Sequence, residues 1–371
     1  MKSPDISSSK SGRQGAAGEE VIRAVRGRAG VLSFRRPETL NAIDETVVVR
    51  MTDALLDWRT RDEVDLVVLD FANPGGLTFS GTDVRFLARC ASWDFRQAIS
   101  FFAAQYRLID LIRRYDKPVV AFLNGRLLGG AIGLAMAAPH RIVTPDAAFQ
   151  FPETRIGLAP DCGSSWYLSR LKNQIGFWLA LTGAELRGSD LVWAGLATRI
   201  EDASGLEQLK ESVFANGTSV LDQPQPVQAS LPNSACEEMV SCFSEDTIDA
   251  VISKLSSGSD WARQQADRIS KTCPLSAGIA LRQLQTGLIL SEPREALRLE
   301  FRILSRLVCT RNFREGVRSV LLEPNSEAEW DPPSFARVTS NRLAPYFAPP
   351  REGELKFIDL PALDHAVAQD G

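Results

Sequence analysis

The first third of the chain contains several short runs of apolar residues. Val21–Val25 and Val31–Phe34 flank the turn signal Gly27-Arg28-Ala29-Gly30, which predicts an antiparallel hairpin. Leu66–Phe71 and Val119–Leu123 are continuous apolar runs of strand length, as is typical of buried strands. The sequence therefore predicts a sheet that begins with a hairpin and continues through buried strands.

Helical patterns separate these runs. Asp44 is a good N-cap, and the apolar positions after it recur with the helical period. A second helix carries its apolar face further along the chain, before strands expected around Arg141–Val143 and Ala148–Phe151. Strands alternating with helices predict an α/β fold of stacked sheets with helices outside. The two apolar faces consist of Val47, Met51, Ala54, Leu55 and Trp58, and of Phe95, Ile99, Phe102, Tyr106 and Ile109.

A stretch rich in Pro, Ser and Gln begins near Asn216 and predicts a linker. Helical patterns dominate after it, for example at Ile248, Val251, Ile252 and Leu255. The predicted organisation is a disordered tail at 1–18, an α/β core at 19–215, a linker at 216–235, a helical C-terminal region at 236–347 and a flexible tail at 348–371.

Composition narrows the classes of function. The chain has 371 residues, of which 44% are hydrophobic, so it can bury a sizeable core. A net charge of −4 offers no general basic field, and we expect no nucleic-acid partner. Six cysteines without CxxC spacing and two distant histidines, His140 and His365, make a metal site or a disulfide framework unexpected.

The chain has no apolar run of 18 residues, so no membrane span is expected. The N-terminal segment also lacks the apolar stretch of a secretory signal. Asp5, Glu19 and Glu20 do not fit the acid-poor pattern of a mitochondrial presequence. We expect a cytoplasmic protein, with the mitochondrial matrix as the alternative.

Two glycine-containing turns could carry chemistry. Thr78–Arg85 follows a buried strand, and in Asn124–Gly133 paired glycines open a helix whose first N–H groups lack intrahelical partners. Two such donors aimed at one oxygen would stabilise a developing oxyanion. The alternative is that both turns serve only close packing.

Two carboxylates, Glu153 and Asp161, lie eight residues apart among Phe, Pro, Ile and Leu. Partial desolvation would raise their pKa values and suit them to acid–base work. The alternative is structural, with Glu153 capping a turn and Asp161 capping the helix that starts near Gly163.

Taken together, these motifs resemble the crotonase (enoyl-CoA hydratase/isomerase) superfamily. The resemblance rests on Arg36-Pro-Glu-Thr-Leu-Asn-Ala42, Ser80-Gly-Thr-Asp83, Gly129-Gly130 and Pro152-Glu153, in the usual order. Within it, Pro152-Glu-Thr-Arg-Ile-Gly-Leu-Ala-Pro-Asp161 is similar to the 3-hydroxyisobutyryl-CoA hydrolase branch. The C-terminal half agrees through Glu300-Phe-Arg302, Phe313–Arg318 and other short matches. The implied fold is a spiral of ββα units whose cleft is covered by a helical C-terminal region.

The resemblance also implies an activity. The backbone N–H groups of Thr82 and Gly130 would hold the thioester oxygen of an acyl-CoA. Glu153 would attack the carbonyl or activate the attacking water, and Asp161 would help to handle the water and its proton. Substrate-binding positions would be Gly81, Asp83, Gly129 and Gly133. The expected substrate is a short 3-hydroxyacyl-CoA, with no cofactor beyond the CoA of the substrate, and homo-oligomers are possible.

Departures from the family pattern keep alternatives open. Thr82 and Ala131 stand where the family has glycine, which would narrow the acyl pocket, and a β-branched residue is costly at positive φ. Gly133 stands where hydratases carry a second glutamate, which favours hydrolysis over hydration. Hydratase or isomerase activity is the enzyme alternative, and a non-catalytic interaction protein is the second.

Overall fold

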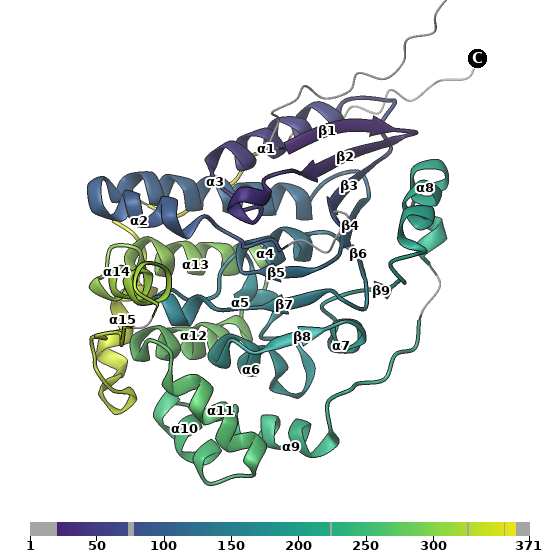
Figure 1. Cartoon of the computed structure of the whole chain (residues 1–371). Helices are drawn as coiled ribbons and strands as arrows, with labels where there is room; N and C mark the ends of the chain where they lie inside the picture. Colours follow the sequence, from purple (N-terminus) through teal and green to yellow (C-terminus); the bar gives the residue numbers. More distant parts are fainter. Residues whose placement is uncertain (1–20, 73–77, 223–224, 325, 352, 361–371) are drawn as a thin grey trace, which may run out of the picture.

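Two sheets organise the first half of the chain in the computed structural model, which describes residues 21–72, 78–222, 225–324, 326–351 and 353–360 (Figure 1). The larger sheet has the strand order β1-β2-β3-β4-β6-β9, and the smaller has the order β5-β7-β8. The β1–β2 and β7–β8 pairs are antiparallel, whereas the other pairs are parallel. The strands are β1 (Val21–Arg26), β2 (Ala29–Phe34), β3 (Leu66–Phe71), β4 (Val119–Leu123), β5 (Arg126–Leu128), β6 (His140–Val143), β7 (Ala148–Gln150), β8 (Glu185–Arg187) and β9 (Arg199–Ile200).

The predicted hairpin is confirmed, with a tighter turn than the sequence suggested. Only Gly27 and Arg28 form the turn, and Gly27 adopts φ 56°, which glycine tolerates without strain. Gly30 is part of β2, where it pairs with Val25, and its Cα lies against the Trp58 ring, where an added Cβ would come within 2.5 Å. The predicted bounds of β3 and β4 are correct, and their apolar residues are buried, as expected for inner parallel strands.

Helices pack around these sheets. The helix predicted from Asp44 is confirmed as α1 (Glu45–Arg59), with the Asp44 side chain accepting from Val47 N at 3.0 Å. The second predicted apolar face lies on α3 (Phe95–Arg113), where Phe102, Tyr106 and Ile109 are at most 3% exposed. Phe95, predicted to share this face, is 50% exposed at the start of the helix. The other helices of this half are α2 (Val84–Trp93), α4 (Gly130–Ala137), α5 (Ser164–Tyr167), α6 (Ile175–Thr182), α7 (Ser189–Ala194) and α8 (Leu206–Asn216).

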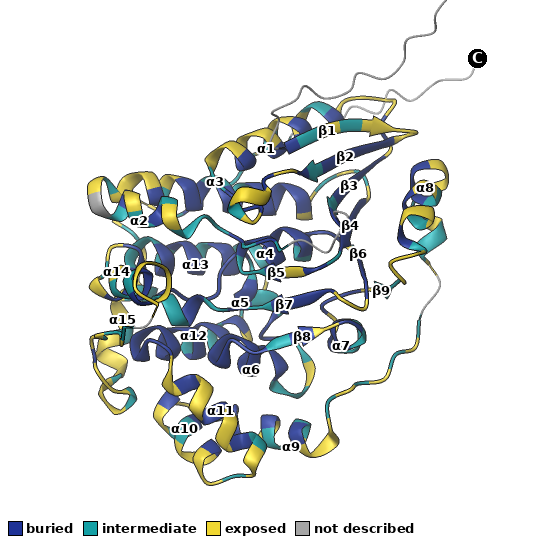
Figure 2. Cartoon of the chain, viewed as in Figure 1, coloured by how far each residue is buried: buried dark blue, intermediate teal, exposed yellow. Residues whose placement is uncertain are grey.

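The second half is helical, as predicted. One hydrophobic cluster runs from β2 through α3 and α4 into α12 and α13, so the C-terminal helices complete the core of the first half (Figure 2). These helices are α9 (Asn233–Cys242), α10 (Ile248–Ser256), α11 (Asp260–Ser270), α12 (Pro274–Gly287), α13 (Pro293–Leu307), α14 (Arg311–Val317) and α15 (Ser340–Phe347). Short turns are η1 (Pro37–Thr39), η2 (Glu153–Ile156), η3 (Lys172–Gln174), η4 (Gly217–Leu221), η6 (Phe335–Arg337) and the π-helical η5 (Arg318–Leu322).

The chain ends require one correction. The tail at 1–18 and residues 361–371 lie outside the described residues. The segment around Leu355, expected to be flexible, instead packs on α13: Leu355 is 3% exposed, and Glu354 pairs with Arg302 at 2.6 Å. The partners of this segment include Arg302 and, 249 residues away, Arg107, which donates to the Lys356 carbonyl, so local composition did not indicate them.

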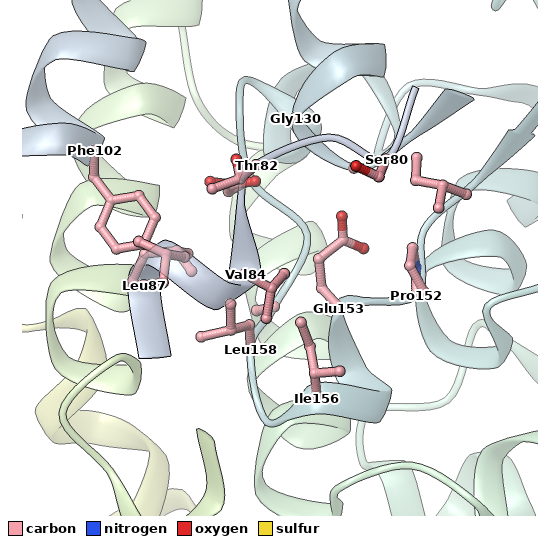
Figure 3. A pocket seen from close by; sticks show the side chains of 15 residues that line it. Ser80, Thr82, Val84, Leu87, Phe102, Gly130, Pro152, Glu153, Ile156 and Leu158 are labelled. Atoms are coloured by element: carbon pink, nitrogen blue, oxygen red, sulfur yellow. The ribbon is translucent and has the colours of Figure 1, made fainter. Parts of the chain in front are cut away.

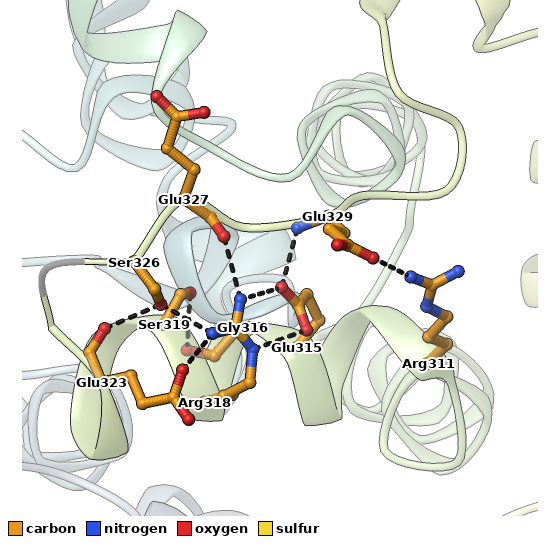
Figure 4. Close-up of polar contacts among 9 residues, drawn as sticks. All are labelled: Arg311, Glu315, Gly316, Arg318, Ser319, Glu323, Ser326, Glu327 and Glu329. Carbon is orange, nitrogen blue, oxygen red and sulfur yellow. Dashed lines mark hydrogen bonds and ion pairs between the residues drawn. The ribbon is translucent and has the colours of Figure 1, made fainter.

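Arg318, directly after α14, links the end of that helix to the segment that follows it (Figure 4). Its guanidinium pairs with Glu315 at 2.6 Å and donates to Ser326 Oγ at 2.8 Å and to the Glu327 carbonyl at 2.9 Å. This network holds the segment after α14 against that helix. Gly316 in the same helix lies so close to η2 that an added Cβ would be 2.4 Å from the Ile156 carbonyl carbon. The position of α14 therefore fixes η2, which begins at Glu153.

Replacing Leu355 by Ala tests the packing of the C-terminal segment. We expect the free energy of unfolding to fall by about 2–5 kcal/mol, because a buried leucine leaves a cavity. Urea denaturation followed by circular dichroism measures this change. Leu322→Ala is the matched control at a 70% exposed leucine, where we expect about 0.5 kcal/mol or less. Equal losses in the two variants would contradict the packing.

Candidate active site

The segment around Thr82 presents an unused backbone N–H. Ile43 forms a parallel β-bridge with Thr82. Ile43 N donates to Gly81 O at 2.7 Å, and Asp83 N donates to Ile43 O at 2.9 Å. Since successive N–H groups of an extended chain point to opposite sides, the Thr82 N–H points away from Ile43. Within the described chain it donates to no acceptor. The positive φ of this turn falls on Gly81, at 79°, so Thr82 avoids the strain that a β-branched residue would suffer there.

Gly129 and Gly130 supply a second unused N–H. Gly129 adopts φ 45° and ψ −118°, a conformation that favours glycine, and it precedes α4. Gly130 is the first helical residue, so its N–H lacks an intrahelical acceptor. An added Cβ on Gly130 would lie 3.3 Å from Thr82 N, and one on Gly81 would lie 3.0 Å from Gly130 N, so the backbones of the two turns are in close contact. The pair can bind one oxygen that develops negative charge.

The Thr82 side chain is anchored to α3. Its hydroxyl bonds with the Gln105 side-chain amide at 3.2 Å, and Gln105 is fully buried. The same two groups exclude a side chain at Gly130, since an added Cβ would be 2.7 Å from each. The hydroxyl that departs from the family pattern therefore ties the Thr82 segment to the helix behind it.

The amides border a small cavity of about 50 Å³ (Figure 3). Its polar end includes Ser80, Thr82, Glu153 and Asp161. Its apolar wall includes Val84, Leu87, Phe102, Ile156, Leu158 and Leu304. By this measure of volume a site for one water molecule needs about 10–15 Å³, so the cavity has room for a small group of atoms. In Figure 3 the Glu153 carboxylate points into this cavity.

Glu153 opens η2 and is 8% exposed. Its Oε2 has no hydrogen-bond partner among the described residues, and an added Cβ on Gly129 would be 2.4 Å from its Oε1. Desolvation, with a smaller contribution from the nearby Asp161 charge, raises the pKa of Glu153 to about 8. The carboxyl group is thus poised to exchange a proton near neutral pH.

Asp161 is also 8% exposed but has partners. Tyr106 of α3 donates its hydroxyl to Asp161 Oδ2 at 2.7 Å, and the Cys162 thiol also bonds with this carboxylate. Desolvation raises the pKa of Asp161 to about 6, while these two hydrogen bonds oppose the increase. The two carboxylates therefore differ: Asp161 ionises first, and Glu153 keeps its proton to higher pH.

The alternative that Glu153 and Asp161 serve only as caps of a turn and a helix does not agree with the structure. Neither η2 nor α5 has a side-chain cap from Glu153 or Asp161. Glu300 of α13 instead accepts from Gly163 N at 2.6 Å and from Ser165 N at 2.7 Å. Glu153 and Asp161 therefore cap no helix, and both line the cavity.

The four predicted substrate-binding positions differ in whether they line the cavity. Gly129 lines the cavity, whereas Gly81, Asp83 and Gly133 do not. Asp83 caps α2 by accepting from Phe86 N at 2.9 Å. Gly133 lies against Cys162, where an added Cβ would be 2.2 Å from the Cys162 Cβ, so it serves close packing. Substrate binding at Gly81, Asp83, Gly129 and Gly133 stays a prediction.

Sequence reasoning missed the part played by α3. Tyr106 was predicted only as part of an apolar face, and Gln105 was not singled out, although both hold residues of the cavity rim. The available signal was a polar amide beside the apolar face of a helix, which is weak. Among the described residues, no group of three or more His, Cys, Asp and Glu could hold a metal ion, and no helix is long and apolar enough to span a membrane.

Glu153→Gln should stabilise the fold increasingly as pH rises. The unfolded carboxyl loses its proton near pH 4.5, whereas the folded protein keeps it to about pH 8. Wild-type stability therefore falls across this window, while glutamine cannot titrate. We expect the variant to gain up to about 4 kcal/mol over wild type by pH 8, measured by urea denaturation at several pH values. Glu237→Gln at an exposed site is the control, and a gap that does not grow with pH would contradict a buried, protonated Glu153.

Comparisons with known proteins agree with this geometry. The human and mouse proteins named 3-hydroxyisobutyryl-CoA hydrolase, mitochondrial are each 32% identical to the chain; the human match covers 92% of both chains, and the mouse match covers 91%. A solved structure described as a carnitinyl-CoA dehydratase from Mycobacterium thermoresistibile superposes with a TM-score of 0.85 at 29% identity, covering 92% of this chain and 99% of that one. An enoyl-CoA hydratase structure from Rhodobacter sphaeroides gives 0.84 at 28%, covering 91% and 100%. The fold is therefore the crotonase fold. A sequence model described as enoyl-CoA hydratase/isomerase matches residues 29–347, and the chain belongs to this family.

Proposed function

We propose that this protein hydrolyses a short 3-hydroxyacyl-CoA thioester, most readily 3-hydroxyisobutyryl-CoA, to the 3-hydroxy acid and free CoA. The observation that carries the proposal is one cavity bordered by two unused backbone N–H groups and two buried carboxylates. The names of the curated relatives support the choice of thioester. By that analogy the reaction would belong to valine breakdown.

In this proposal the thioester oxygen lies between the N–H groups of Thr82 and Gly130, which form an oxyanion hole. Negative charge develops on that oxygen as the carbonyl carbon becomes tetrahedral. Fixed amide donors in a water-poor site stabilise such charge without having to reorganise, and losing one donor typically costs about 10²–10³ in rate. Because the donors are backbone groups, a threonine can fill the first position.

Glu153 provides the attack. Once ionised, it removes a proton from the water that attacks the carbonyl, or it adds to the carbonyl itself and forms a mixed anhydride. Asp161, ionised at lower pH and held by Tyr106, orients the water in both routes; in the second route it takes the proton of the water that hydrolyses the anhydride and releases Glu153 as a carboxylate. In both routes the C–S bond breaks, the water oxygen ends in the new carboxylic acid, and CoA leaves as a thiolate that takes up a proton.

The cavity size supports a short acyl group. A volume of about 50 Å³ with an apolar wall fits a few carbon atoms next to the carbonyl. The CoA portion would lie outside the cavity as part of the substrate, and no separate cofactor is proposed. Homo-oligomerisation and location in the cytoplasm or the mitochondrial matrix stay predictions.

Hydration of an enoyl-CoA is the second candidate, favoured by the two solved structures described as a dehydratase and a hydratase. Asp161 could take the place of the second glutamate that Gly133 replaces. Loss of the conjugated enoyl absorbance of crotonyl-CoA without thiol release would favour hydration over hydrolysis.

Thiol release measures the proposed activity. The substrates are 3-hydroxyisobutyryl-CoA, 3-hydroxypropionyl-CoA, crotonyl-CoA and acetyl-CoA, followed with a chromogenic thiol reagent. We expect fastest release from the 3-hydroxyacyl thioesters and a loss of at least about 10³-fold in Glu153→Gln, because the attacking group is removed. Glu237→Gln should match wild type. Folded wild-type protein that releases no thiol from any substrate would overturn the proposal.

The pH profile of kcat/KM gives an independent check. Glu153 must lose its proton to act, and its raised pKa is about 8. We therefore expect kcat/KM, after subtraction of the non-enzymatic rate, to rise about tenfold per pH unit between about pH 6 and pH 7, to rise more steeply below pH 6, where Asp161 is also protonated, and to level off above about pH 8. A plateau that begins near pH 5 would argue against Glu153 as the attacking group.

A further inference from the structure

The turn that carries Asp161 has an unusual backbone. We define it as the 160–165 turn, Pro160–Ser165. Cys162 adopts φ 60° and Gly163 adopts φ 89°, so two consecutive residues have left-handed conformations. A non-glycine residue in this region costs about 1–2 kcal/mol and persists where surrounding contacts impose it. Those contacts come from the C-terminal helices.

Glu300 of α13 provides most of them. Its carboxylate is fully buried and accepts four hydrogen bonds from the 160–165 turn. The donors are Gly163 N at 2.6 Å, Ser165 N at 2.7 Å, Ser165 Oγ at 2.7 Å and Ser164 Oγ at 3.3 Å. Desolvation raises the pKa of Glu300 to about 8, although the hydrogen bonds from Ser165 and Gly163 oppose the increase. With four donors converging on one buried side chain, Glu300 determines the path of the backbone after Asp161.

Gln283 of α12 holds the other side of the turn. Its amide Nε2 donates to the Pro160 carbonyl at 2.6 Å and to Ser165 Oγ at 2.8 Å, and Gln283 is also fully buried. Pro160 immediately precedes Asp161, and Gly163 follows it by two residues. The backbone on both sides of Asp161 is therefore fixed by side chains that lie more than 100 residues later in the chain, from helices that pack on α5 (Figure 1).

We propose that Glu300, supported by Gln283, is a positioning residue that holds the 160–165 turn so that the Asp161 carboxylate faces the cavity. Glu300 does not line the cavity, so it acts through Asp161. This inference rests on the proposed function. It assigns the C-terminal helices α12 and α13 a part in setting the geometry of the reaction, in addition to completing the core.

Glu300→Gln tests the proposal. The amide keeps the shape of the side chain, but each carboxylate oxygen of Glu300 accepts from one backbone N–H, of Gly163 or of Ser165, so the new NH₂ group removes the acceptor of one of them and we expect the turn to shift. A displacement of about 1 Å at a group that orients water can cost about 10² in rate, and we expect kcat to fall between about tenfold and 10²-fold with KM within about twofold. Asp190→Asn is the matched control: this buried carboxylate accepts from Ser230 N at 2.7 Å, away from the cavity, and should leave kcat unchanged.

A double-mutant cycle separates positioning from general damage. If Glu300 acts through Asp161, then Glu300→Gln should cost less than about twofold in an Asp161→Asn background, because the group to be positioned is already lost. The residual rate of Asp161→Asn, which keeps the amides and Glu153, is followed by mass spectrometry of released CoA. An equal loss in both backgrounds would overturn the positioning role.

Cys162 reports the turn without any activity. It is 1% exposed and lies directly after Asp161. We expect alkylation of Cys162 by N-ethylmaleimide, quantified on its peptide by mass spectrometry, to be at least about tenfold faster in Glu300→Gln and unchanged in Asp190→Asn. If wild type releases no thiol from any thioester, the proposed function fails, and this labelling still decides whether Glu300 holds the turn. Unchanged labelling would overturn the inference.

Gln283→Met is the second variant, should Glu300→Gln not fold. It keeps the apolar volume and removes the donor to the Pro160 carbonyl. We expect the same direction in both measurements, with kcat reduced about threefold to tenfold and faster Cys162 labelling. If folded Gln283→Met has the same kcat and the same Cys162 labelling rate as wild type, Gln283 does not hold this side of the turn.

Discussion

Desolvation of Glu153 is the constraint on which the site depends. A carboxyl group with no partner for one oxygen, buried beside a second carboxylate, is costly to ionise. The fold tolerates it because η2 is clamped by α14 through the close approach of Gly316 to Ile156. A raised pKa, and therefore a strong base when ionised, follows directly from this rigid burial.

The helix α3 links the elements of the cavity. Phe102 forms part of the wall, Gln105 holds Thr82, and Tyr106 holds Asp161. These residues lie about one turn apart on the same helix. The helix α3 therefore fixes the distance between the Thr82 amide and the Asp161 carboxylate. From the other side, α12 and α13 hold the turn after Asp161. The site is thus enclosed by helices from both halves of the chain.

The sequence predicted what depends on local pattern. The bounds of β3 and β4, the cap at Asp44 and the family were correct, because apolar runs, caps and turn motifs are read within a few residues. Thr82, Gly130, Glu153 and Asp161 do meet at one cavity, although their roles stay proposals. The hold of Glu300 on Gly163, across 137 residues, could not be predicted, and neither could the packing of Leu355. Such contacts depend on tertiary structure that no single segment encodes.

Infrared difference spectroscopy of the protonated carboxyl band, wild type minus Glu153→Gln, measures the ionisation of Glu153 most directly. The account predicts a carboxyl band that persists at pH 6 and disappears with a midpoint near pH 8. A band already absent at pH 6, with a midpoint near the ordinary value of 4.5, would contradict a desolvated Glu153 and with it the basis of the proposed chemistry.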